Sequence, residues 1–147
     1  MREVLEAAET LVRDRLAAYG RGAARYGLIH ADRRLANLLI DGGDTRLIDF
    51  DDCGFGWFMY DFAAGISFME EHPQVPALRE AWLDGYRAVR PLDREDEVEI
   101  DSFIMLRRMA LLAWTGSHAG TDLARSQAPH FAAGTARLAE AYLARFA

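Results

Sequence analysis

The sequence contains no lysine, because all 17 of its basic residues are arginine. Any mechanism that needs a lysine, either to form a Schiff base or to anchor a phosphate, therefore cannot be completed by this chain alone. There is a single cysteine, Cys53, so an internal disulfide is excluded. This cysteine usage favours a reducing compartment, and we expect a cytoplasmic protein.

Other absences narrow the class of protein further. The formal net charge is -6 and no basic run is present, which argues against nucleic acid as a partner. The first residues carry acids where a signal peptide needs a basic start, and the most apolar region is broken by Arg107 and Arg108. We therefore expect neither a secretory leader nor a membrane span. The length of 147 residues and the 51% hydrophobic content are typical of one globular domain.

The apolar pattern predicts a mainly helical fold. Apolar residues recur at helical spacing in five segments: residues 1–19, 61–71, 75–89, 94–118 and about 130 to the end. Two short strands, residues 38–40 and 46–50, flank the turn sequence Asp41-Gly42-Gly43-Asp44, which predicts a β-hairpin. We expect residues 53–58 to form an irregular aromatic loop. The fold class expected is α+β, predominantly helical, in a single domain over residues 1–147.

The polar residues of this hairpin region follow an informative spacing. His30-x-Asp32 is followed by four intervening residues and then Asn37, next by the hairpin, and then by Asp49 at the end of a strand. This is the spacing of a kinase catalytic loop and its metal-binding aspartate. Phosphoryl transfer needs one carboxylate to take the proton of the acceptor hydroxyl and hard oxygen ligands to hold Mg²⁺ beside the phosphates. This spacing therefore predicts Asp32 as the base and Asn37 and Asp49 as metal ligands.

Residues 27–67 resemble the aminoglycoside phosphotransferase / choline kinase superfamily, which includes type II homoserine kinases. The resemblance implies the C-terminal lobe of a protein-kinase-like fold, with a small hairpin at the catalytic loop. It implies transfer of the γ-phosphoryl group of ATP, with Mg²⁺, to the hydroxyl of a small molecule. It also implies that Asp61 braces the catalytic loop and that His30 supports the loop by hydrogen bonding.

Several other side chains are candidates for contacts to phosphate or substrate. Arg33 stands where the superfamily usually has leucine, and either it points at phosphate or it disturbs the packing of the loop; Arg34 is its neighbour. Asp51 and Asp52 are either ligands or solvated acids. Aromatic residues after the hairpin either line an acceptor pocket or pack the loop on the core; they are Phe55, Trp57, Phe58 and Tyr60. For the pair at positions 107 and 108, we favour a solvated helix edge over a phosphate contact.

The segment that precedes His30 reads as one helix, with no glycine-rich loop. We therefore expect this chain to be the C-terminal lobe of a phosphotransferase without its nucleotide lobe, and to be inactive alone. An exposed lobe surface should lead to self-association or to pairing with a separate N-terminal lobe. Two alternatives stay open: a pseudokinase-like binding module without catalysis, and a Ser/Thr protein kinase of the same superfamily.

Overall fold

The computed structural model describes the backbone of residues 1–147 and every side chain except those of residues 128 and 129. Its elements, in chain order, are α1 (Arg2–Tyr19), β1 (Tyr26–Ile29), the short 3-10 helix η1 (Leu35–Asn37), β2 (Leu38–Asp41), β3 (Asp44–Leu47), β4 (Gly54–Trp57), α2 (Tyr60–Gly65), α3 (Val75–Arg87), α4 (Arg94–Ser117) and α5 (Asp122–Phe146). The prediction of an α+β, predominantly helical fold is confirmed.

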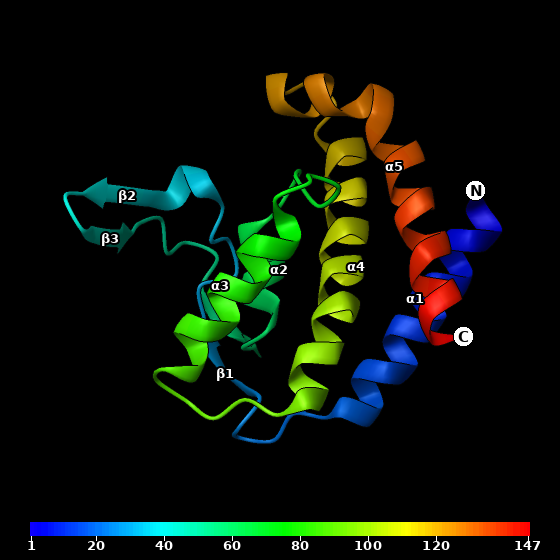
Figure 1. Cartoon of the computed structure of the whole chain (residues 1–147). Coiled ribbons are helices and arrows are strands. Elements are labelled where there is room, and N and C mark those ends of the chain that lie inside the picture. The colour runs from blue at the N-terminus through cyan, green and yellow to red at the C-terminus, as the bar shows by residue number, and fades with distance from the viewer.

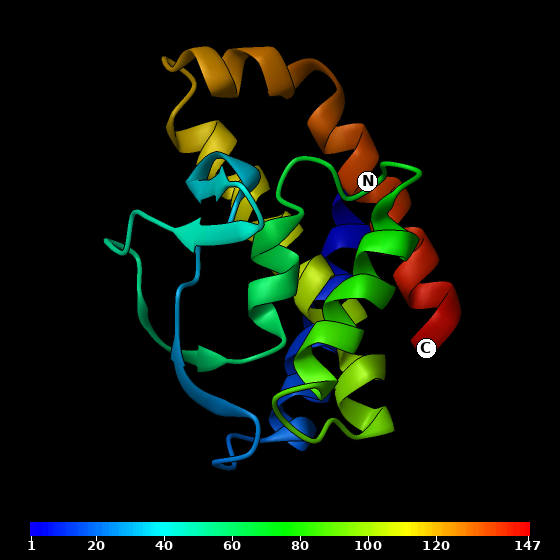
Figure 2. The same ribbon diagram turned by 60° about the vertical axis from the view of Figure 1, so that its left-hand side comes forward.

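Helix α4 runs through the middle of the molecule, with α1 and α5 on one side and α2 and α3 on the other (Figure 1). The β2–β3 hairpin projects from the body in both views (Figures 1 and 2). The core lies where α1, α2, α4 and α5 meet, and its fully buried members on α4 include Ile100, Phe103 and Met105. Burial of these side chains is the main source of stability in such a bundle.

Helix boundaries follow the capping residues in two cases. Asp93 is the N-cap of α4 as predicted, and its backbone N–H donates to the carboxylate of Asp96 at 3.0 Å. The hydroxyl of Tyr19 also donates to Asp96, and burial together with this bond raises the pKa of Tyr19 above its ordinary value. Helix α5 begins after Thr121, whose hydroxyl accepts from the Ala124 backbone N–H at 3.2 Å.

Two of the predicted helix limits were wrong. The last helix starts about eight residues earlier than expected, because its first turns are largely exposed and carry no apolar stripe to reveal them. Helix α2 ends at Gly65 rather than before His72. The backbone of Phe68 has φ of 68°, and a residue in this left-handed region cannot continue a right-handed helix.

The predicted hairpin is confirmed, with Asp41 paired to Asp44 across a turn in which Gly42 has φ of 62°. Its second strand lies at residues 44–47, earlier than expected, because Asp49 has φ of 62° and leaves the extended conformation.

The expectation of an irregular loop over residues 53–58 was wrong. Strand β4 pairs antiparallel with β1, with Gly56 opposite Gly27. A Cβ at Gly56 would lie 2.5 Å from Cδ1 of Ile29, and a Cβ at Gly27 would lie 2.9 Å from the ring of Phe58. Close packing therefore favours glycine here, since a larger residue would force Ile29 or Phe58 to move, although glycine is a poor signal for a strand.

Candidate active site

The side chain of Asp61, in the first turn of α2, holds the loop after β1 by hydrogen bonds. The Asp61 carboxylate accepts hydrogen bonds from the backbone N–H of His30 at 3.1 Å and from that of Ala31 at 2.8 Å. Ala31 has φ of 67°, a strained conformation that the two bonds help to hold. The position of Asp32 is therefore set by a side chain from the helical body.

His30 connects this loop to the segment after the hairpin. Its Nδ1 accepts from the Asp32 backbone N–H at 3.2 Å, so Nε2 carries the proton and donates to the Ile48 carbonyl at 2.9 Å. The ring also meets Phe50 edge-on, with centroids 4.8 Å apart. His30 thus makes supporting contacts on both sides of the loop.

Asp32 as a whole residue is 8% exposed, and its carboxylate lies between two guanidinium groups. Arg34 Nε donates to its two oxygens at 3.1 and 3.2 Å, and Arg107 Nη2 donates to Oδ1 at 2.8 Å. Arg107 also donates to Ser67 Oγ at 2.9 Å and to the Tyr60 hydroxyl at 3.4 Å. Charge-assisted bonds of this kind hold a carboxylate in one orientation.

The expectation that positions 107 and 108 form a solvated helix edge was wrong. The side chain of Arg107 is 15% exposed, and that of Arg108 is 4% exposed. Arg108 pairs with Glu70 rather than with solvent. The sequence indicated an edge because two adjacent arginines interrupt an apolar helix, whereas the carboxylates that neutralise them come from distant positions.

Asn37 and Asp49 are linked through the backbone of Ile48. The Ile48 N–H donates to the Asn37 carbonyl at 3.0 Å, so Asp49 directly follows the residue that is bonded to Asn37. The Asn37 side-chain nitrogen donates to the Asp32 carbonyl at 2.8 Å and to Asp32 Oδ2 at 3.2 Å. Asp32 and Asn37 are therefore in direct contact, and Asp49 is the next residue in sequence after the one that bonds to Asn37.

Two of the predicted residues can supply oxygen ligands to a divalent cation. Because the amide nitrogen of Asn37 is committed to Asp32, its oxygen can serve as a ligand, and the carboxylate of Asp49 is exposed. Mg²⁺ prefers hard oxygen ligands and takes only one or two from protein. Within the described side chains there is no cluster of three or more His, Cys, Asp and Glu residues that could hold a metal ion. A cation at this position would therefore depend on the mixed amide and carboxylate pair.

A cavity of about 450 Å³ opens beside Asp32. Its lining residues come from the loop, from the turn after the hairpin, from α2 and the segment after it, from α4 and from the start of α5: Ala31, Asp32, Arg34, Asp52, Tyr60, Phe68, Arg107, Ala110, Leu111, Trp114 and Leu123. This volume suits a small organic molecule. Sequence reasoning missed the part of the wall that α4 supplies. The signal was present, since positions 107, 111 and 114 lie on one helical face.

The structure places the remaining candidates in different surroundings. Arg34 and Asp52 line the cavity, while Asp51 is exposed in the adjoining turn. Arg33 lines a separate cavity beside α3. Trp57 donates from Nε1 to the Gly20 carbonyl at 2.7 Å and packs near Phe103, away from Asp32.

The other aromatic candidates also differ in their surroundings. Tyr60 faces the cavity that contains Asp32, Phe58 lines the separate cavity beside α3, and Phe55 is 78% exposed. Of the aromatic candidates, Tyr60 therefore lines the cavity beside Asp32, and the others do not.

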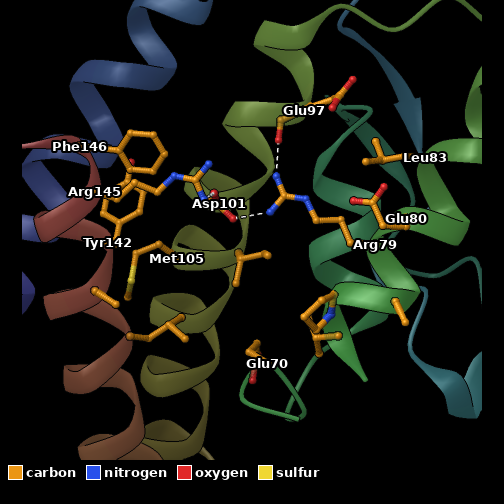
Figure 3. Close-up of a pocket in the computed structure, with 16 residues that line it drawn as sticks. Glu70, Arg79, Glu80, Leu83, Glu97, Asp101, Met105, Tyr142, Arg145 and Phe146 are labelled. Carbon is orange, nitrogen blue, oxygen red and sulfur yellow. Dashed lines mark hydrogen bonds and ion pairs between the residues drawn. The ribbon is translucent and has the colours of Figure 1, made fainter. Parts of the chain in front are cut away.

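A second cavity, of about 640 Å³, lies between α3, α4 and α5 and shares no lining residue with the first (Figure 3). Arg79 Nη1 donates to Asp101 at 2.6 Å, and a second arginine, Arg145, lies 2.5 Å from the other oxygen of this carboxylate. Arg79 also donates to the Glu97 carbonyl. Arg79, Asp101 and Arg145 are thus paired with one another, and they tie α3 and α5 to α4.

None of the described helices is both long and apolar enough to cross a membrane.

Comparison with known proteins shows which family this chain resembles. The family model described as APH, "Phosphotransferase enzyme family", matches residues 2–97. The chain is 39% identical over 75 residues to a homoserine kinase of Neisseria meningitidis serogroup B, covering 48% of this chain and 25% of that protein. The resemblance inferred from the catalytic-loop residues is confirmed.

Two solved structures share the fold. A microcompartment-associated aminopropanol kinase superposes with a TM-score of 0.90 at 47% identity, covering 98% of this chain and 46% of that one. The amicoumacin kinase hAmiN, in complex with AMP-PNP, Ca²⁺ and Ami, gives a TM-score of 0.71 at 26% identity, covering 95% of this chain and 44% of that one. The chain thus spans between a quarter and a half of the length of these relatives.

Proposed function

Because the chain belongs to the phosphotransferase enzyme family, we propose that it is the catalytic-loop lobe of an ATP-dependent kinase that phosphorylates a hydroxyl group of a small molecule. One observation carries this proposal. The carboxylate of Asp32 lines a cavity of small-molecule size, and the Asn37 amide that contacts it is connected by backbone bonding to the segment bearing Asp49.

Each of these residues has a role that follows from its contacts. Asp32 accepts the proton of the acceptor hydroxyl as the acceptor oxygen bonds to the γ-phosphorus and the bond from that phosphorus to ADP breaks. Arg34 and Arg107 hold the carboxylate in the orientation that this transfer needs. Asn37 and Asp49 would hold Mg²⁺, which when bound neutralises charge on the phosphates. Asp61 positions the loop and does not touch the reacting atoms.

The lining of the cavity favours an acceptor that carries an amine. The two arginines in the wall, Arg34 and Arg107, are both paired with Asp32. Asp52 makes no ion pair within the described part of the chain, and the aromatic residues Trp114 and Tyr60 line the same cavity. A carboxylate beside aromatic faces suits an ammonium group. A small amino alcohol is therefore the acceptor class that we propose, in line with the aminopropanol kinase that shares this fold.

The nucleotide-binding part of the site has to come from sequence outside these 147 residues or from a separate chain. Large apolar side chains of the strand region are exposed: Leu28, Leu39, Ile40, Phe50 and Phe55. We name these five residues the apolar strip. Exposed apolar side chains commonly mark an interaction surface, and we propose that the nucleotide lobe covers part of this strip. Alone, the chain is expected to bind ATP poorly and to catalyse no appreciable transfer.

The test is phosphoryl transfer from ATP to aminopropanol, followed by ³¹P NMR, with the chain joined to the nucleotide-binding half of the aminopropanol kinase. The joined protein should form the phosphate ester. Asp32→Asn should lower kcat by a factor of roughly 10²–10⁴, the range of general base catalysis. Asp44→Asn is the matched control, because Asp44 is an exposed acid at the hairpin turn, and it should stay within about twofold of the parent.

Two results would refute the proposal. One is full activity in Asp32→Asn. The other is a folded joined protein that transfers phosphate to no member of a panel of small alcohols and amino alcohols. Robust transfer by the 147-residue chain alone would overturn the narrower statement that a nucleotide lobe is required.

A further inference from the structure

The loop after α2 contains a strained aromatic residue. Phe68 has φ of 68°, a conformation that a bulky side chain rarely adopts. Within the described part of the chain the other non-glycine residues with positive φ are Ala31 and Asp49, and both belong to the candidate active site. Strained backbone of this kind tends to occur where the surrounding structure needs a precise position.

A buried ion pair holds Phe68 in this conformation. Its backbone N–H donates to Glu70 Oε1 at 3.2 Å, and Arg108 Nη1 donates to Glu70 Oε2 at 2.5 Å. Arg108 also donates from Nε to Thr135 Oγ1 at 2.9 Å, which connects the loop to α5. The side chain of Glu70 is completely buried. Because burying an ion pair costs much of what its attraction contributes, such a pair is better suited to fixing a geometry than to adding stability.

The ring of Phe68 is fixed as well as the backbone. It packs against Trp114 of α4 with centroids 6.3 Å apart, and against Phe131 of α5 with centroids 5.5 Å apart. Both partners sit on helices of the main body. The ring is therefore clamped on two sides and cannot swing away without disturbing these contacts.

This ring stands between two cavities. Phe68 lines the cavity of about 450 Å³ that contains Asp32, and it also lines a cavity of about 400 Å³ on its other side, next to His72 and Gln127. Arg108 and Phe131, which hold the ring, line only the second of these. We expect loss of the ring to connect the two spaces.

We propose that Phe68 is a specificity-determining residue that limits the length of the acceptor, a role that rests on the proposed function. An acceptor whose hydroxyl reaches Asp32 has its other end stopped by the Phe68 ring. Short amino alcohols fit in front of the ring, and longer ones are excluded. Glu70 and Arg108 are positioning residues, because they act on the acceptor only through Phe68.

The test measures binding of aminopropanol, aminobutanol, aminohexanol and aminooctanol to the 147-residue protein by ligand-observed NMR. In the wild type, affinity should fall as the chain lengthens. In Phe68→Ala, the ratio of aminooctanol affinity to aminopropanol affinity should rise about tenfold or more, the gain expected when additional methylene groups are buried. Phe55→Ala removes an exposed ring outside the cavity and should keep the wild-type ratio.

Two further variants keep the test decisive if Phe68→Ala does not fold. Phe68→Leu retains an apolar side chain of smaller size and should shift the ratio in the same direction by less. Glu70→Gln keeps the shape of Glu70 while weakening its pairing with Arg108, and it should raise the ratio although it leaves the ring in place. A purely structural role would change stability in these variants without changing the length preference.

The outcomes separate the two proposals. An unchanged ratio in every folded variant, a wild type that binds all four lengths equally, or no binding by any protein would overturn the role of Phe68. A ratio that shifts as expected, in a joined protein that transfers no phosphate, would support the role of Phe68 in limiting ligand length and refute the proposed kinase function.

Discussion

Several large apolar side chains are exposed in the strand region (β1 to β4), whereas the large apolar side chains at the core of the helical body (α1 to α5) are buried. In the body, Phe103 and Ile100 are completely buried. In the strand region, Phe55 is 78% exposed and Ile40 is 70% exposed. Burial drives folding, whereas exposed apolar surface tends to find a partner. The buried core of the helical body therefore stabilises the fold, and the exposed apolar side chains of the strand region are suited to binding another surface.

The candidate active site lies at the boundary of the two regions and draws on both. The helical body orients Asp32, through Asp61 on α2 and Arg107 on α4. The segment after the hairpin carries Asp49, whose carboxylate is exposed. In the proposed function, the base is thus held by contacts from the helical body, and the second cation ligand is an exposed carboxylate. On this proposal, the chain would bind the acceptor and would depend on a second lobe for transfer.

The largest expected effect comes from the core of the helical body. Phe103→Ala should lower the free energy of unfolding by about 3–5 kcal/mol, because it removes a buried ring and leaves a cavity. Urea denaturation followed by circular dichroism measures this. Phe55→Ala, the matched change in the strand region, should cost less than about 0.5 kcal/mol. Equal losses in the two variants would contradict the contrast between the regions.

The next effect lies at the boundary. Asp61→Ala removes the acceptor of two backbone N–H groups and should destabilise the protein by about 2–3 kcal/mol. Hydrogen exchange at His30 and Ala31 should speed up, while exchange in the middle of α4 should change no more than global stability requires. Asp61→Asn keeps one acceptor oxygen and should give a smaller effect. Unchanged exchange at these two amides would show that Asp61 does not hold the loop.

A smaller effect is expected from the strain at Phe68. Phe68→Gly and Phe68→Ala both remove the ring, but glycine adopts positive φ without penalty. The glycine variant should therefore be more stable than the alanine variant by about 1 kcal/mol. Comparing their denaturation midpoints tests this directly, and an alanine variant as stable as the glycine variant would mean that the loop has relaxed to another conformation.

The smallest effect on stability is expected in the apolar strip. Leu28 and Phe55 face each other across β1 and β4, and both are largely exposed. The double variant Leu28→Ser, Phe55→Ser should leave the free energy of unfolding within about 1 kcal/mol. It should nevertheless reduce self-association in sedimentation at tens of micromolar. A wild type that is strictly monomeric under these conditions would count against the strip as an interaction surface.

The sequence predicted the hairpin, the cap at Asp93 and the long central helix because each depends on local signals. A turn that contains two glycines, an aspartate that caps a helix, and apolar residues at helical spacing can each be recognised within a short stretch of sequence. The strand over residues 54–57 was missed because it contains glycine, a poor strand signal, which is favoured at Gly56 by close packing against Ile29 of β1, a tertiary cause.

The site residues divide in the same way. The spacing of Asp32, Asn37 and Asp49 is local and could be recognised. The contacts of Arg107 and Phe68 join segments that are far apart along the chain, so spacing could not reveal them. The pairing of Arg108 with Glu70 joins α4 to the loop after α2, and no short motif marks it.

The most direct test of the central claim is to locate a divalent cation by the paramagnetic broadening that Mn²⁺ causes in amide NMR signals. Signals near Asp32, Asn37 and Asp49 should be lost first as Mn²⁺ is added, and Asp49→Ala should retain them at the same concentration. Broadening that is strongest elsewhere, or that is unchanged in Asp49→Ala, would contradict a phosphoryl-transfer site built on these three residues.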